Sequence, residues 1–203
     1  MRNKRRGSEF PPGYYRMTDE QKVTEAKKIL SNAPSDPRQW NDETCGVAHI
    51  LAQLSVARRD YIAVSTCSDG LLSCYIAQYG VGNEANVLPA AYNAGLAHWR
   101  LEDTLGVISV TKSVYDYWVS EQIPTARSLR RLAKMVRLYT CSVRPREASR
   151  LNKRVLVGSL RHGRFLRFVR SLVFQTVIGL GLYGLAGNPQ LEGRMKRRPK
   201  GTR

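Results

Sequence analysis

The chain has 203 residues and a formal net charge of +17, from 33 basic and 16 acidic side chains. This charge far exceeds the roughly 2–8 that suits a small soluble domain. It disfavours a freely diffusing cytosolic enzyme, because self-repulsion opposes the compact state, and it favours a polyanionic partner, either nucleic acid or an anionic membrane surface. A hydrophobic content of 42% is enough for a core and excludes a wholly disordered chain.

Residues 1–17 are predicted to form an extended basic arm. A cluster of four cations opens the segment, and Pro11-Pro12-Gly13 then resists helix formation. Thr18, followed three residues later by Gln21, matches a capping box. The spacing therefore predicts that a first helix covers about 19–31 and that a helical body begins here.

Helical periodicity continues from about residue 41 to residue 140. Asn41 or Asp42 can cap a second helix, a third is expected over about 60–79, and Gly80, Gly82 and Asn83 indicate a loop. Further helices are expected from Pro89, from Glu102 to about Val119, and after a cap at Thr125. The fold predicted for residues 18–140 is therefore all-α, a series of antiparallel helical hairpins.

A weak internal repeat has an offset of 43 residues. At this offset Asp60 aligns with Asp103, Ile62 with Leu105 and Val64 with Val107. Helical-repeat arrays have periods of about 33–47 residues. The segments Pro89-Ala90-Ala91-Tyr92-Asn93-Ala94-Gly95-Leu96 and Arg100-Leu101-Glu102-Asp103 resemble the first helix and turn of a pentatricopeptide repeat, and a tetratricopeptide-like hairpin fits equally.

This resemblance implies a degenerate α-solenoid of a type that binds RNA. The first helix is short and the second long for the family, so its base-reading positions are not transferred to this chain. An ordinary bundle of amphipathic helices remains the alternative.

The positive charge is concentrated at the ends of the chain. Residues 1–40 carry a net charge of +4, residues 41–122 carry −5 and residues 123–203 carry +18. The chain has 24 Arg and 9 Lys, and Arg binds phosphate through two parallel hydrogen bonds. Residues 141–203 are therefore predicted to be an extended basic C-terminal arm that binds RNA phosphates. The predicted RNA-binding residues are Arg2, Lys4, Arg5, Arg6, Arg127, Arg130, Arg131, Lys134, Arg137, Arg144, Arg146, Arg150, Lys153, Arg154, Arg161, Arg164, Arg167, Arg170, Arg194, Lys196, Arg197, Arg198 and Lys200.

An uncharged apolar stretch at 171–187 interrupts this arm. Its 17 residues are at the lower limit of the roughly 17–25 that cross a bilayer, and its glycines suit close helix packing. The sequence leaves open whether this predicted helix enters a membrane or is buried in a large assembly.

Other motifs do not indicate catalysis. The Gly-x-Gly-x-x-Gly string at 179–184 lacks the helix, strand and acid that a dinucleotide site needs. Cys45, His49, Cys67 and Cys74 match no standard zinc spacing, and the cysteines are interpreted as reduced thiols. We therefore expect no enzyme activity, cofactor, metal or small-molecule substrate.

Together these features predict a structural rRNA-binding component of a large ribonucleoprotein. The Arg-rich ends and small helical body resemble ribosomal proteins in general, and the helical-repeat character points by analogy to a mitochondrial ribosome in the matrix. The expected partners are rRNA and neighbouring proteins. One alternative is an accessory subunit of a mitochondrial inner-membrane complex anchored by 171–187, and another is an RNA-processing factor of the pentatricopeptide type.

Overall fold

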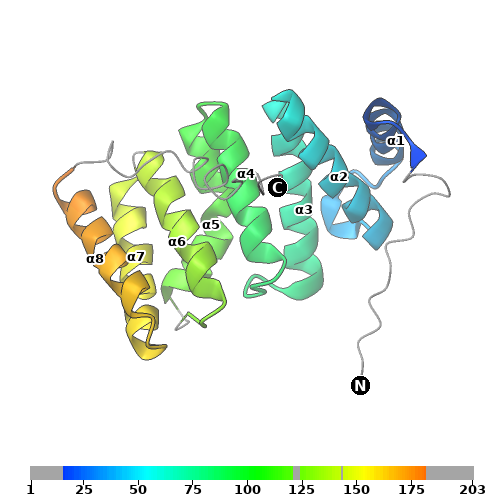
Figure 1. Cartoon of the computed structure of the whole chain (residues 1–203). Coiled ribbons are helices and arrows are strands. Elements are labelled where there is room, and N and C mark those ends of the chain that lie inside the picture. Colours follow the sequence, from blue (N-terminus) through cyan, green and yellow to red (C-terminus); the bar gives the residue numbers. More distant parts are fainter. Residues whose placement is uncertain (1–15, 121–123, 143, 182–203) are drawn as a thin grey trace, which may run out of the picture. The chain divides into compact units, whose positions relative to one another are not determined.

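A computed structural model describes residues 16–120, 124–142 and 144–181. Within these ranges the chain is all-α, with eight α-helices packed as consecutive hairpins and no strand (Figure 1). The predicted all-α class and the series of helical hairpins are thereby confirmed. The chain divides into an N-terminal unit, Met1–Thr111, and a C-terminal unit, Lys112–Arg203, and the boundary lies inside one helix.

Between residues 18 and 141 the observed helices follow the predicted boundaries closely. The helix predicted over 19–31 is present over these residues, and the Thr18–Gln21 capping box has both of its hydrogen bonds, at 2.9 and 3.3 Å. Asn41 caps the next helix by accepting a hydrogen bond from the Thr44 backbone N–H. The helices are α1 Asp19–Ser31, α2 Asp42–Arg58, α3 Tyr61–Tyr79, α4 Val87–Arg100, α5 Thr104–Ser120, α6 Ser128–Cys141, α7 Pro145–Arg161 and α8 Phe165–Gly179, and a short 3-10 helix, η2, covers Pro37–Gln39.

The N-terminal unit packs α1, α2, α3 and α4 in succession. Small and medium apolar side chains fill the core, which lets the helices approach closely. Trp40 covers this core, and its indole N–H donates a hydrogen bond to the Pro34 carbonyl. The buried core residues include Val23, Ala26, Val47, Ala48, Leu51, Leu71 and Cys74.

The C-terminal unit packs α7 between α6 and α8. Leu129, Leu132 and Val136, which recur with helical periodicity after Thr125, are almost fully buried in α6. Helix α7 packs against α6, and its Leu151 and Val155 are buried as well. Residues 145–179 are therefore folded as two helices, although this region was expected to belong to an extended basic arm.

The 43-residue offset reappears in the backbone at two hairpin turns. Arg59 and Glu102, which are 43 residues apart, both have a φ of 60°, the left-handed conformation that ends a helix. The next residues, Asp60 and Asp103, donate their backbone N–H to carbonyls five residues earlier at 3.0 Å. Both Asp side chains then accept a hydrogen bond from the backbone N–H three residues later. Each Asp thus closes one helix and caps the next.

The side chains at this offset also match. Val64 and Val107 are buried, whereas Ile62 and Leu105 are 70% and 72% exposed. The alignment made from the sequence therefore pairs residues with equivalent positions in their hairpins.

Candidate nucleic-acid interface

Four arginines gather on one side of the C-terminal unit. Arg130 comes from α6, Arg164 caps the start of α8, and Arg167 and Arg170 lie on α8. The pKa of Arg167 lies below its ordinary value, because the side chain is partly buried and because Arg164, Arg130 and Arg170 repel its charge. We call these four residues the arginine quartet.

The quartet results from how α6 and α8 flank α7. Arg137 follows Arg130 by seven residues, about two helical turns, and Phe174 follows Arg167 by the same number. The guanidinium of Arg137 lies 5.8 Å from the ring centroid of Phe174. Two matched pairs spaced by seven residues mean that α6 and α8 run in the same direction. The three-residue spacing of Arg164, Arg167 and Arg170 then keeps the three cations near one side of α8.

The charge of the quartet is not neutralised by carboxylates. From Ala148 to Gly181 the sequence contains no Asp or Glu. None of the ion pairs in the described part of the chain involves a quartet arginine. Unfavourable repulsion is thus built into the folded unit, and an anion that bridges the guanidiniums would relieve it.

The other predicted RNA-binding residues have mixed environments. Those exposed to solvent are Arg127, Arg146, Arg150, Lys153 and Arg161, and those partly buried are Arg131, Lys134, Arg137, Arg144 and Arg154. Residues outside the described ranges are Arg2, Lys4, Arg5, Arg6, Arg194, Lys196, Arg197, Arg198 and Lys200.

One of the predicted residues, Arg154, is engaged within the fold. Its Nε donates to the Val119 carbonyl at 2.7 Å, and its terminal nitrogen donates to the Val119 and Ser120 carbonyls. These carbonyls belong to the last two residues of α5, and the final carbonyls of a helix are the ones that need a partner from outside it. Arg154 therefore caps α5.

The predicted apolar helix at 171–187 overlaps α8 only in part. Helix α8 begins at Phe165, six residues earlier than expected, so that Arg167 and Arg170 lie inside it. Residues 182–187 lie outside the described ranges. Among the helices that are described, none combines the length and apolarity needed to cross a membrane.

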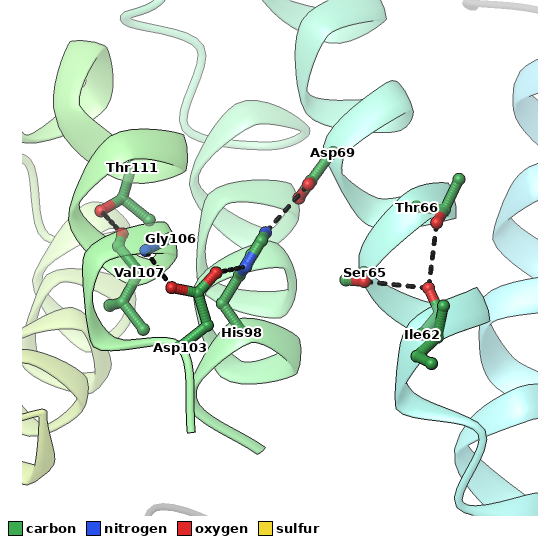
Figure 2. Close-up of polar contacts among 9 residues, drawn as sticks. All are labelled: Ile62, Ser65, Thr66, Asp69, His98, Asp103, Gly106, Val107 and Thr111. Carbon is green, nitrogen blue, oxygen red and sulfur yellow. Dashed lines mark hydrogen bonds and ion pairs between the residues drawn. The ribbon is translucent and has the colours of Figure 1, made fainter. Parts of the chain in front are cut away.

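A second polar cluster lies in the N-terminal unit, where His98 sits between two carboxylates (Figure 2). Its Nε2 is 2.9 Å from Asp69 Oδ2 on α3, and its Nδ1 is 2.9 Å from Asp103 Oδ2 at the start of α5. Asp103 Oδ1 also accepts the Gly106 backbone N–H at 2.7 Å. Because both ring nitrogens are engaged, the geometry suits a brace between helices rather than proton transfer to a substrate.

The electrostatics of this brace favour a charged imidazole. Burial opposes the cation, but the hydrogen bonds to Asp69 and Asp103 outweigh it and raise the pKa of His98. Burial raises the pKa of Asp69 more than its bond to His98 lowers it, and Asp69 Oδ1 is buried without a partner. The Gly106 hydrogen bond and then His98 lower the pKa of Asp103.

The sequence did not reveal this brace. His98 had no evident partner along the chain, because Asp69 lies 29 residues earlier and meets it only through packing of α3 on α4. The Glu102-Asp103 pair was correctly expected at a helix start, and Asp103 was the one signal available. As the residue that caps the start of α5, Asp103 had to lie close to the end of α4, where His98 is.

The residues considered as zinc ligands lie in other environments in the described structure. The Sγ atoms of Cys45 and Cys74 are 2.7 Å apart in the core, and His49 Nε2 is 2.8 Å from Gln53 Nε2. Burial raises the pKa of Cys67 to about 11. Within the described ranges no group of three or more His, Cys, Asp or Glu side chains is arranged to hold a metal ion.

Comparison with protein-family models, with curated proteins and with solved structures finds no match to this chain. Function must therefore be inferred from the chain's own side chains.

Proposed function

We propose that this protein is a structural RNA-binding component of a large ribonucleoprotein, and that the arginine quartet contacts the RNA backbone. The observation that supports this most strongly is the gathering of Arg130, Arg164, Arg167 and Arg170 without a compensating carboxylate. A folded chain that keeps four repelling cations together gains stability when a phosphate neutralises them.

Phosphate recognition explains why these cations are arginines. A guanidinium donates two parallel hydrogen bonds to one phosphate and can also stack on a base, which an ammonium cannot do. Arg127 and Arg161 of the same unit are also exposed and add to its positive charge. Contacts of this kind position a protein on RNA without reading its sequence.

The repeated turns support a degenerate α-solenoid as the finer description of the fold. Arg59-Asp60 and Glu102-Asp103 close their hairpins in the same way, 43 residues apart, within the range of known helical repeats. In our proposal the nearly neutral helical body binds neighbouring proteins, while basic segments at both ends bind rRNA. By analogy with the helical-repeat character, we propose that this complex is a mitochondrial ribosome in the matrix.

Sedimentation tests the proposal directly. Lysate of cells that express the protein is separated on a sucrose gradient, with and without ribonuclease, and the chain is followed by immunoblot. We expect it to sediment with large particles and to move to light fractions after ribonuclease treatment. Light fractions in both samples, or heavy fractions that ribonuclease leaves unchanged, would contradict the proposal.

A further inference from the structure

The outward face of α8 is apolar and exposed. Its five apolar residues recur at steps of one, three and four, so they form one strip along the helix. Phe165 and Leu166, at 71% and 77% exposed, are among the most exposed large apolar side chains in the described structure. We call Phe165, Leu166, Val169, Leu172 and Val173 the α8 strip.

The inward face of α8 is, by contrast, joined to α7 through polar groups. Asn152 Nδ2 donates to the Ser171 carbonyl at 2.8 Å and to Gln175 Oε1 at 3.0 Å. Gln175 Nε2 in turn donates to Ser149 Oγ at 2.6 Å. The inward face of α8 thus carries hydrogen-bonding groups beside the buried Ile178, while the apolar strip is turned toward solvent.

The contrast with α1 shows that this chain can give a surface helix a polar outer face. Helix α1 exposes Glu20, Gln21, Thr24, Lys27 and Lys28 and turns Val23 and Ala26 inward. A face like the α8 strip is costly in water, since burying apolar surface is favourable by about 25 cal/mol per Å². The strip is therefore expected to be covered by an apolar partner.

We propose that the α8 strip binds the surface of an anionic membrane. The strip lies beside Arg164 and Arg170, and the whole segment from Ala148 to Gly181 lacks acids. An apolar strip beside arginines matches a lipid interface, where acyl chains take up the apolar side chains and headgroup phosphates pair with the cations. A second copy fits poorly, because its own arginines would face the first set.

The packing on α7 determines how the helix would lie. Since Ser171, Gln175 and Ile178 face the protein, the α8 strip is the apolar face of the helix that is left to meet lipid. Helix α8 would therefore lie in the plane of the interface with its apolar residues below the headgroups. Arg164 and Arg170 also belong to the arginine quartet, so the test below changes only the apolar strip and measures RNA binding separately.

Vesicle sedimentation tests the proposal on the full chain. The probes are vesicles of phosphatidylcholine with phosphatidylserine and vesicles of phosphatidylcholine alone. The test variant is Leu166→Gln with Leu172→Gln, which leaves the charge unchanged. The matched control is Ile62→Gln with Leu105→Gln, because both residues are as exposed as Leu166 and, like it, occupy the second position of a helix.

We expect the wild type and the control to bind the anionic vesicles and the test variant to bind about tenfold or more weakly, because two leucines no longer enter the acyl region. Binding to single-stranded RNA and the circular dichroism spectrum should stay unchanged in both variants. The proposal is overturned if the wild type does not bind the anionic vesicles, or if the test variant and control bind equally. Loss of RNA binding with the strip variant would also overturn it, since the strip would then belong to the RNA surface.

Discussion

Replacement of Gly106 by alanine tests the His98 brace. In a helix, alanine is ordinarily more stable than glycine by up to about 1 kcal/mol. At Gly106, however, a Cβ would lie 2.0 Å from Asp103 Oδ2 and 2.3 Å from His98 Nδ1. Both groups would have to move by more than an ångström, which would break the brace, and overpacking of this kind typically costs about 1–3 kcal/mol. We therefore expect Gly106→Ala to destabilise the protein by roughly 1 kcal/mol, with the helix gain already subtracted.

The repeated turn supplies a matched control. Ala63 occupies the equivalent position in α3, where its N–H donates to Asp60, the counterpart of Asp103. Ala63→Gly should lower stability by about 0.5–1 kcal/mol through backbone entropy alone. If the brace is real, both opposite substitutions destabilise the protein in urea unfolding followed by circular dichroism. If Gly106→Ala instead raises the stability, as at an ordinary helical position, the reasoning about the brace is refuted.

Two further predictions concern pH and a helix cap. Because the pKa of His98 is raised above its ordinary value of 6.5, its contribution to stability is full below that pH and is lost as the pH rises through the raised value. Melting temperatures should therefore decline with rising pH from this cause, His98→Gln should remove that decline, and His49→Gln should keep it. Arg154→Gln should destabilise the fold by about 1–3 kcal/mol, because it leaves carbonyls at the end of α5 without a charged donor. Its exposed neighbour Lys153, changed to Gln, should shift stability by less than about 0.5 kcal/mol, and an equal effect at both positions in urea unfolding would contradict the cap.

Local sequence signals predicted much of the fold. The Thr18–Gln21 capping box and the cap at Asn41 act on neighbouring residues, so they could be recognised without knowledge of the tertiary structure. The 43-residue offset likewise reflected a turn whose geometry depends on Asp60 and Asp103. Apolar periodicity predicted α6 correctly, because Leu129, Leu132 and Val136 face the core.

Features that depend on packing could not be predicted in this way. The charge of residues 123–203 indicated an anion-binding region, but only the parallel course of α6 and α8 brings Arg130 beside Arg167. The basic composition also favoured an extended arm over 141–203, whereas buried Leu151 and Val155 hold α7 in a folded unit. The role of Arg154 as a cap for α5 arises from contacts 34 and 35 residues apart.

The salt dependence of RNA binding tests the central claim most directly. Fluorescence anisotropy with a single-stranded RNA compares the wild type, a variant with all four quartet arginines changed to Gln, and a control with four exposed cations of the N-terminal unit changed to Gln, namely Lys27, Lys28, Arg38 and Arg58. Both variants lose the same charge. Each phosphate contact contributes about 0.7 to the slope of log K against log salt, so removal of the quartet should lower the slope by about 2.8. The control should retain the wild-type slope. Equal slopes for the quartet variant and the wild type, or the same reduction in the control, would contradict the assignment of the quartet as the RNA-contacting surface.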